Sequence, residues 1–146
     1  MKNHVLHILL VEDNEDDVLL IEESLSIARH PYELHVACDG DDALMYMRRE
    51  GKYRDAILPG IILLDINMPK KDGFEVLREI KSDPGLQHLP VVILTTSDRE
   101  ADILRSYANG AASFITKPAK FGQMQTVLKQ FLLYWSFVSR VPVRGN

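Results

Sequence analysis

The sequence predicts a doubly wound α/β fold, in which a five-stranded parallel sheet carries helices on both faces. Short apolar runs recur along the 146 residues, and a segment with apolar side chains at three- and four-residue spacing follows each run. Parallel strands need crossover connections, and right-handed crossovers return the helices to the sheet. Regular alternation of strand and helix therefore favours this architecture.

Each predicted element is bounded by turn-forming or polar residues. The predicted strands are 5–11, 32–38, 61–64, 91–94 and 112–115. The predicted helices are 15–28, 41–50, 73–82, 100–109 and 121–138. Asp83-Pro84-Gly85 and Asn109-Gly110 supply the stops after two of these helices. The stretch 51–59 has the character of a loop inserted between a helix and the third strand.

Length and composition predict a single domain over residues 1–146, with a core of about 5–138 and a short C-terminal tail, 139–146. The apolar runs are far shorter than the ~20 residues that cross a bilayer. A net charge of -4 disfavours binding to nucleic acid or to anionic membranes, which need concentrated positive charge. Cys38 is the only cysteine and is expected to be a buried apolar side chain, which suits a reducing cytoplasm.

Chemically active side chains stand at the ends of the predicted strands. Glu12 and Asp13 end the first strand, Asp65 the third, Thr95 the fourth and Lys117 the fifth. The functional crevice of an open α/β sheet lies at the carboxyl ends of its strands. Three carboxylates crowded there repel one another and lose hydration, a cost that a hard divalent cation offsets. The sequence therefore predicts a magnesium site, with Asp65 as the first candidate residue.

A purely structural interpretation remains open for several of these residues. Residues 14–17 suit the cap and first turn of a helix, where side-chain oxygens and negative charge stabilise free backbone N–H groups, and we expect that role for them. Lys117 could form only a structural ion pair, and Thr95 could be an ordinary β-branched strand residue.

The turn after the first strand argues against nucleotide-binding folds of similar architecture. Dinucleotide-binding and P-loop folds place glycines there so that backbone N–H groups hold phosphates. The corresponding segment, Glu12-Asp13-Asn14-Glu15, would repel a free phosphate. A flavodoxin-like flavin binder is disfavoured for the same reason.

Together these motifs resemble the receiver domains of two-component response regulators over nearly the whole chain. The matching segments are Leu10-Val11-Glu12-Asp13, Leu63-Leu64-Asp65-Ile66-Asn67-Met68-Pro69, Asp72-Gly73, Leu94-Thr95 and Thr116-Lys117-Pro118. Each is weak by itself, but the ordered set at the strand ends is specific. The resemblance implies a flavodoxin-like strand order of 2-1-3-4-5.

The resemblance also implies a role for each acidic residue. Asp65 is the expected phosphoacceptor and also a metal ligand. Asp13 is expected to bind Mg²⁺ or Mn²⁺ directly, and Glu12 directly or through water. The backbone carbonyl of Asn67 would complete the ligands from the protein.

Four further residues match the family's switch region. Lys117 and Thr95 are expected to contact the phosphoryl group. Phe114 corresponds to the aromatic switch residue, although it could equally be ordinary core. Pro118 lies where the family often has a cis peptide bond, an isomer that the sequence does not reveal.

Within the family, the chain is most similar to the small response regulators that partner bacterial phytochromes. The similarity lies in the loop 51–59, the segment 69–73, the turn 94–97 and the aromatic C-terminal helix. It implies a sensor histidine kinase as phosphoryl donor, with a phytochrome as one candidate. The protein would be a cytoplasmic signalling switch that catalyses its own phosphotransfer and dephosphorylation, and not a conventional enzyme. Since only a short segment follows the last helix, we expect output by contact with an unidentified downstream protein.

The last helix carries more apolar surface than packing on a sheet requires. Its apolar residues are Phe131, Leu132, Leu133, Tyr134, Trp135, Phe137 and Val138. We expect a homodimer through this helix region; alternatively, the tail folds back and covers these side chains.

Two other functions stay open for the site. One is a receiver fold that binds partners without phosphorylation, against which the complete set of site residues argues. The other is a phosphohydrolase with Asp65 as nucleophile. Such enzymes usually carry a second acid two residues later, where this chain has Asn67.

Overall fold

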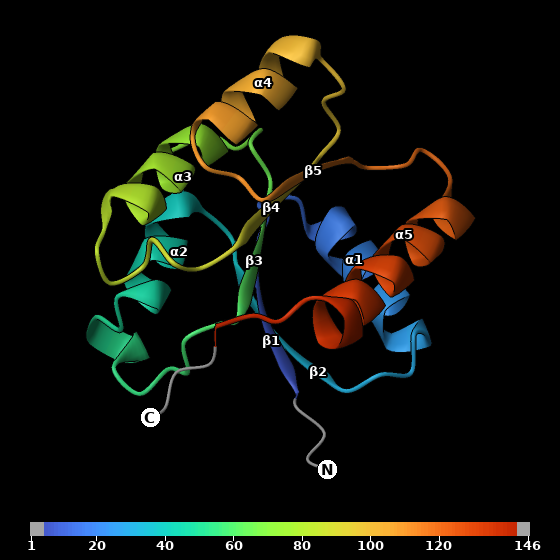
Figure 1. The fold of residues 1–146 in the computed structure, drawn as a ribbon, viewed down its shortest axis with the longest axis horizontal. Helices are drawn as coiled ribbons and strands as arrows, with labels where there is room; N and C mark the ends of the chain where they lie inside the picture. The colour runs from blue at the N-terminus through green and yellow to red at the C-terminus, as the bar shows by residue number, and fades with distance from the viewer. Residues whose placement is uncertain (1–4, 143–146) are drawn as a thin grey trace.

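The computed structural model describes residues 5–142, apart from the side chain of Phe121, and shows a parallel sheet between two layers of helices (Figure 1). The strands are β1 (Leu6–Val11), β2 (Tyr32–Ala37), β3 (Ile61–Leu64), β4 (Val91–Thr95) and β5 (Ser113–Thr116). All four strand pairs are parallel, and the sheet order is β2-β1-β3-β4-β5. The predicted fold class and strand order are therefore confirmed. The predicted domain limits include residues 1–4 and 143–146, which lie outside the described residues.

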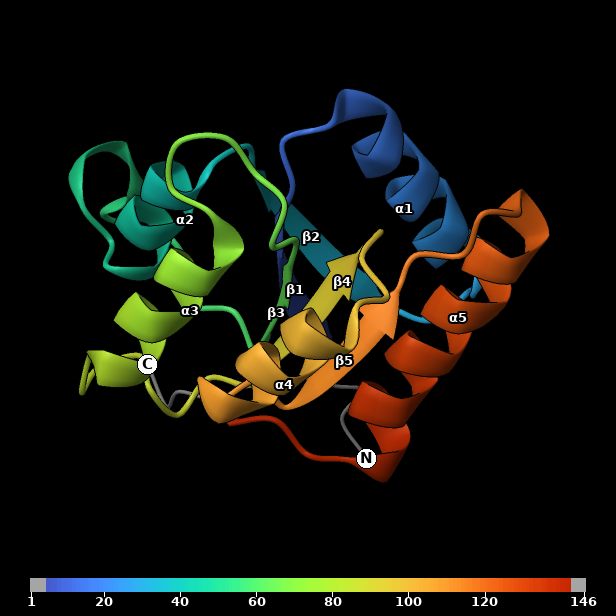
Figure 2. The same ribbon diagram turned by 90° about the horizontal axis from the view of Figure 1, so that it is seen from above.

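Helices cover both faces of the sheet, as Figures 1 and 2 show. They are α1 (Glu15–Ile27), α2 (Gly40–Met47), α3 (Gly73–Ser82), α4 (Glu100–Ala108) and α5 (Phe121–Leu133). In the pictures α2, α3 and α4 lie on one face, while α1 and α5 lie side by side on the other. Within residues 5–142, no helix is long and apolar enough to cross a membrane.

The central strands are apolar on both faces because each face packs against helices. Side chains alternate along β1, so Leu9 and Val11 join a cluster with α2 and α3, while Ile8 and Leu10 join one with α1 and α5. All four residues of β3 are fully buried. This explains why β3 (IILL) and the start of β4 (VVIL) are continuous apolar runs with no polar alternation.

The C-terminal segment differs from the single predicted helix 121–138. Regular α5 ends at Leu133, and a π-helical turn, η2 (Tyr134–Val138), follows. The chain then passes along the lower edge of the sheet in Figure 1, where Val141 packs beside Gly60. A β-carbon on Gly60 would lie 2.8 Å from a methyl carbon of Val141, so glycine makes room for this crossing.

Two local expectations near β2 and α2 are wrong. Cys38 is exposed because β2 ends one residue earlier, at Ala37, and leaves Cys38 in the turn before α2. The helix predicted over 41–50 ends at Met47, and Arg49 adopts a left-handed φ of 56° that cannot continue a helix. A short 3₁₀ turn, η1 (Gly51–Tyr53), begins the inserted loop.

Candidate active site at the carboxyl ends of the strands

The sheet register brings the predicted site residues to one edge. Val11 pairs with Leu64 and Thr95 pairs with Thr116, so the strands finish at the same level. The residues that follow continue this pairing: the Asp65 N–H donates to the Val11 carbonyl at 3.1 Å, and the Lys117 N–H donates to the Thr95 carbonyl at 2.6 Å. Parallel strands that end together place their next side chains in one crevice.

Lys117 is the centre of this crevice. Its side chain is only 4% exposed, and its ammonium group donates to three carboxylates. The distances are 2.5 Å to Glu12 Oε1, 2.8 Å to Asp17 Oδ2 and 3.2 Å to Asp65 Oδ2. An ammonium group has three N–H donors, so these contacts use all of them.

Burial and neighbouring charges shift the pKa values of Glu12 and Lys117. Burial raises the pKa of the Glu12 carboxyl to about 7; the Lys117 hydrogen bond opposes the rise, and the charge of Asp65 adds to it. Burial acts to lower the pKa of Lys117, but hydrogen bonds to Asp17 and Glu12 and the charge of Asp65 outweigh it, so that pKa lies above its ordinary value. At neutral pH the ammonium is charged, and Glu12 is close to the midpoint of its titration.

The acidic residues fit a divalent cation. Glu12, Asp13 and Asp65 each offer a carboxylate oxygen, and these oxygens all lie within 4.8 Å of one another. Glu12 and Asp65 are buried, whereas Asp13 is exposed and leaves the group open to solvent. Backbone N–H groups orient both buried carboxylates: Asn14 donates to Glu12 at 3.2 Å and Asn67 to Asp65 at 3.0 Å. Several hard oxygen donors converging in this way suit Mg²⁺ or Mn²⁺.

Thr95 lies beside the acids at the end of β4. The residue is fully buried, and its Oγ1 accepts a hydrogen bond of 3.2 Å from the side-chain amide of Asn67 and one of 3.4 Å from the Ser97 N–H. Phe114, on the neighbouring strand, is half-buried and packs against the core cluster beneath α2 and α3. The Lys117–Pro118 peptide bond is trans.

Gly73 fixes the backbone that carries Asp65. A β-carbon on this glycine would lie 2.4 Å from the Asp65 carbonyl oxygen and 2.5 Å from the Ile66 α-carbon, so no side chain fits there. Its N–H donates to the Ile66 carbonyl at 3.2 Å. Asp72 caps α3 in a reciprocal capping box with Glu75. The Asp72-Gly73 motif therefore locks the start of α3 against the end of β3.

Two side chains at the site were not identified from the sequence. Asn14 does cap α1, as predicted, by accepting from the Asp17 N–H at 3.0 Å, but the Asp17 carboxylate also binds Lys117. The sequence carried no signal for this contact, because Asp17 reads as an ordinary first-turn acid after the cap. For Asn67 only the backbone carbonyl was predicted, whereas the structure shows its amide bound to Thr95.

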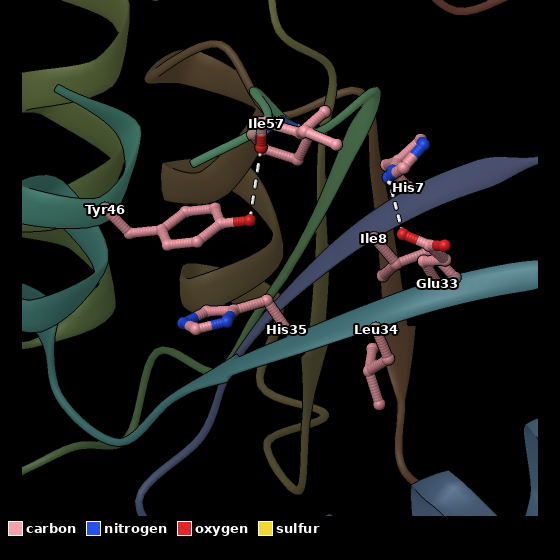
Figure 3. A pocket seen from close by; sticks show the side chains of 8 residues that line it. His7, Ile8, Glu33, Leu34, His35, Tyr46 and Ile57 are labelled. Carbon is pink, nitrogen blue, oxygen red and sulfur yellow. Dashed lines mark hydrogen bonds and ion pairs between the residues drawn. The ribbon is translucent and has the colours of Figure 1, made fainter. Parts of the chain in front are cut away.

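A separate hollow of about 210 Å³ lies beside the edge strand β2, near the starts of β1 and β2 (Figure 3). His7 Nδ1 and Glu33 Oε2, 3.4 Å apart, border it on one side. The stacked rings of His35 and Tyr46, 4.0 Å apart, border the other side. The acidic residues of the crevice are not among its lining, so it is distinct from the candidate active site.

Comparison with known proteins agrees with the geometry. The family model of the response regulator receiver domain matches residues 8–129. Response regulator Rcp1 of Synechocystis sp. (strain ATCC 27184 / PCC 6803 / Kazusa) is 39% identical over 135 residues, which are 92% of each chain. The phosphorylated cyanobacterial phytochrome response regulator RcpA is a similar solved structure, with a TM-score of 0.90 and 45% identity over 95% of this chain and 99% of that chain. The Mn²⁺-bound form of Rcp1 has a TM-score of 0.88 and 37% identity over 94% and 99%.

Proposed function

This chain belongs to the response regulator receiver family, and we propose that it acts as a phosphorylation-dependent switch that accepts a phosphoryl group on Asp65. The observation that carries the proposal is the position of Asp65, which is buried at the end of β3, binds Lys117 and has oxygens of Glu12 and Asp13 within 4.8 Å. A buried carboxylate in such surroundings is a candidate nucleophile.

In the proposed reaction the Asp65 carboxylate attacks the phosphorus of a phosphohistidine, and the donor imidazole leaves on the opposite side. Lys117 stabilises negative charge on the transferring oxygens with the N–H that now points at Asp65. The Asn67 N–H, 3.0 Å from Asp65 Oδ1, holds the nucleophile in a fixed orientation. When Mg²⁺ or Mn²⁺ is held by Glu12, Asp13, Asp65 and the carbonyl of Asn67, it supplies further charge neutralisation. The same groups would assist hydrolysis of the aspartyl phosphate.

Thr95 and Phe114 are the proposed output residues. The phosphoryl group adds acceptor oxygens and about two negative charges beside the Thr95 hydroxyl, which would move to donate to it. That movement would vacate space for the half-buried ring of Phe114 and so change the surface formed by α4, β5 and α5. A coupling free energy of about 1–3 kcal/mol is enough for such a switch.

The proposed phosphoryl donor is a sensor histidine kinase. The similarity to RcpA, described as a phytochrome response regulator, supports a phytochrome as that kinase. We propose a cytoplasmic protein that signals by contact with a downstream protein. The net charge of -4 supports partners other than nucleic acid and membrane lipid.

We also propose a homodimer through the C-terminal helix region. Phe131 and Leu132 are buried within the domain, but Tyr134, Phe137 and Val138 are 48%, 69% and 72% exposed. Large apolar side chains exposed together on one turn favour a protein contact. Sedimentation at high concentration, with and without a phosphoryl mimic, should show a dimer that Phe137→Ser weakens; a monomer under every condition would end this part of the proposal.

The decisive experiment follows intact mass during incubation with a small phosphodonor, with and without Mg²⁺. We expect one phosphoryl adduct that requires Mg²⁺ and is absent in Asp65→Asn. An adduct that persists in Asp65→Asn would show a different acceptor. No adduct under any condition would favour a receiver fold that binds partners without phosphorylation.

A further inference from the structure

Asp17 differs from the other two carboxylates that bind Lys117. Glu12 and Asp65 belong to the trio of acids that fit a divalent cation, whereas Asp17 does not. A cation in the crevice would therefore share Glu12 and Asp65 with the ammonium group and would also repel it. Of the three partners of Lys117, only Asp17 would remain for the lysine alone.

We propose that Asp17 is a positioning residue that keeps Lys117 in the crevice when the divalent cation binds. It would act by offering a carboxylate that is not one of the three metal-binding acids. The ammonium group could then give up its contacts with Glu12 and Asp65 to the cation and still remain in the crevice. This inference deepens the proposed function, because it rests on Glu12, Asp13 and Asp65 being the metal ligands.

The position of Asp17 suits this role. It lies in the first turn of α1, where its backbone N–H is fixed by the Asn14 cap at 3.0 Å. Its carboxylate thus comes from a helix, while the other two partners come from the ends of β1 and β3. The side chain is 33% exposed, against 1% for Glu12 and 7% for Asp65, so Asp17 binds the lysine from the solvent side of the crevice.

The test is a double-mutant cycle on Mg²⁺ affinity, measured by calorimetry. Asp17→Asn keeps the shape of the side chain but removes the charge that offsets Lys117. Without the Asp17 charge, the Lys117 ammonium group depends more on Glu12 and Asp65 and competes with Mg²⁺ for these two carboxylates. We therefore expect the Mg²⁺ dissociation constant to rise about tenfold. Asp16→Asn is the matched control, because it removes the same charge from the same helical turn on an exposed side chain. We expect it to change the constant by less than about threefold, through weak long-range electrostatics.

The same substitution is then made in a chain without the ammonium, Lys117→Met. With no lysine to position, Asp17→Asn should have only the small effect of Asp16→Asn. Equal effects of Asp16→Asn and Asp17→Asn in the parent protein would overturn the proposal without any need for the lysine variant. An undiminished effect of Asp17→Asn in Lys117→Met would also overturn it, since Asp17 would then act on the metal site independently.

A second measurement separates this inference from the proposed function. At saturating Mg²⁺, the initial rate of phosphorylation by a small phosphodonor should fall about tenfold in Asp17→Asn and remain near the parent rate in Asp16→Asn. If the parent protein binds Mg²⁺ but accepts no phosphoryl group, the proposed function fails, whereas the calorimetric cycle still decides the role of Asp17. If the parent protein binds no Mg²⁺, the metal site and the role of Asp17 fail together.

Discussion

The side-chain amide of Asn67 donates a hydrogen bond of 3.2 Å to Thr95 Oγ1 and so joins the end of β3 to the end of β4 beside Asp65. The Thr95 oxygen is an acceptor in this contact and in the contact with the Ser97 N–H. Its own O–H remains available to a group arriving on Asp65. Asn67 binds both residues, because its backbone N–H also donates to Asp65 Oδ1 at 3.0 Å.

Thr95→Val tests the proposed switch while preserving shape and strand propensity. We expect phosphorylation of Asp65 to persist, because the nucleophile and Lys117 are untouched, but the response of β5 to be lost. Amide chemical shifts around Phe114, recorded with and without phosphodonor, would measure that response. Stability should change by no more than about 1 kcal/mol, because the exposed Asn67 amide can turn to water. If the amide shifts around Phe114 changed on phosphorylation as they do in the parent protein, the proposed role of Thr95 in the switch would be wrong.

Gly73→Ala should disturb the backbone that carries Asp65. The added methyl carbon meets the Asp65 carbonyl and the Ile66 α-carbon at less than van der Waals distance, so we expect a loss of about 2–4 kcal/mol in unfolding free energy and slow phosphorylation. Gly122→Ala is the control, because nothing lies within 4 Å of its β-carbon position; there, in α5, alanine should be neutral or stabilise by up to about 1 kcal/mol. Urea unfolding monitored by circular dichroism would give the unfolding free energies of both variants. If Gly73→Ala were as stable as Gly122→Ala, the backbone at the end of β3 would be able to adjust to the added methyl group.

Mg²⁺ affinity should increase with pH between about 6 and 8. Burial raises the pKa of Glu12 from 4.5 to about 7, and a metal ligand must lose its proton. Titration calorimetry in buffers of different ionisation enthalpy would show proton release on binding near pH 6.5. In Glu12→Gln the pH dependence should flatten over this range, whereas an unchanged profile would assign the titration to another group.

The same pKa shift makes a prediction for the metal-free protein. Because the folded-state pKa of Glu12 lies above the unfolded value, the folded chain binds the extra proton more tightly. The stability that this group contributes is complete below about pH 4.5 and is lost as the pH rises through about 7. Added Mg²⁺ should restore stability at the upper end of the range. Thermal unfolding of parent protein and Glu12→Gln from pH 5 to 8 would measure this, and parallel curves for the two would contradict it.

Lys117→Met should destabilise the metal-free protein near pH 8 by about 3–5 kcal/mol, because it leaves the buried carboxylates of Glu12 and Asp65 without their cation. The loss should be smaller at pH 5, where Glu12 is protonated, and smaller in Mg²⁺. Lys129→Met, at an exposed position on α5, is the control and should be nearly neutral. A variant as stable as its control at pH 8 would show that the carboxylates are solvated without the lysine.

The sequence predicted the centre of the sheet well because β3 and β4 are buried on both faces and read as apolar runs. The sequence also predicted that Glu12, Asp13, Asp65, Thr95 and Lys117 come together, because the carboxyl ends of parallel strands lie at one edge of the sheet. Asp17 was not predicted to join them, since a first-turn acid beside a cap has the same sequence signature whether it meets solvent or Lys117. The end of α5 was missed for another reason: an apolar helical pattern does not distinguish an α-helix from the π-helical turn that follows Leu133.

The ion pair between Glu12 and Lys117 joins residues 105 positions apart, the first strand to the last. Lys117 directly follows β5, which joins the sheet only through its pairing with β4. In the proposed reaction, a chain in which β5 has not paired would hold Asp65 without the ammonium group of Lys117 beside it. Under the proposed function, acceptance of a phosphoryl group would therefore require the sheet to be formed across its full width, from β1 to β5.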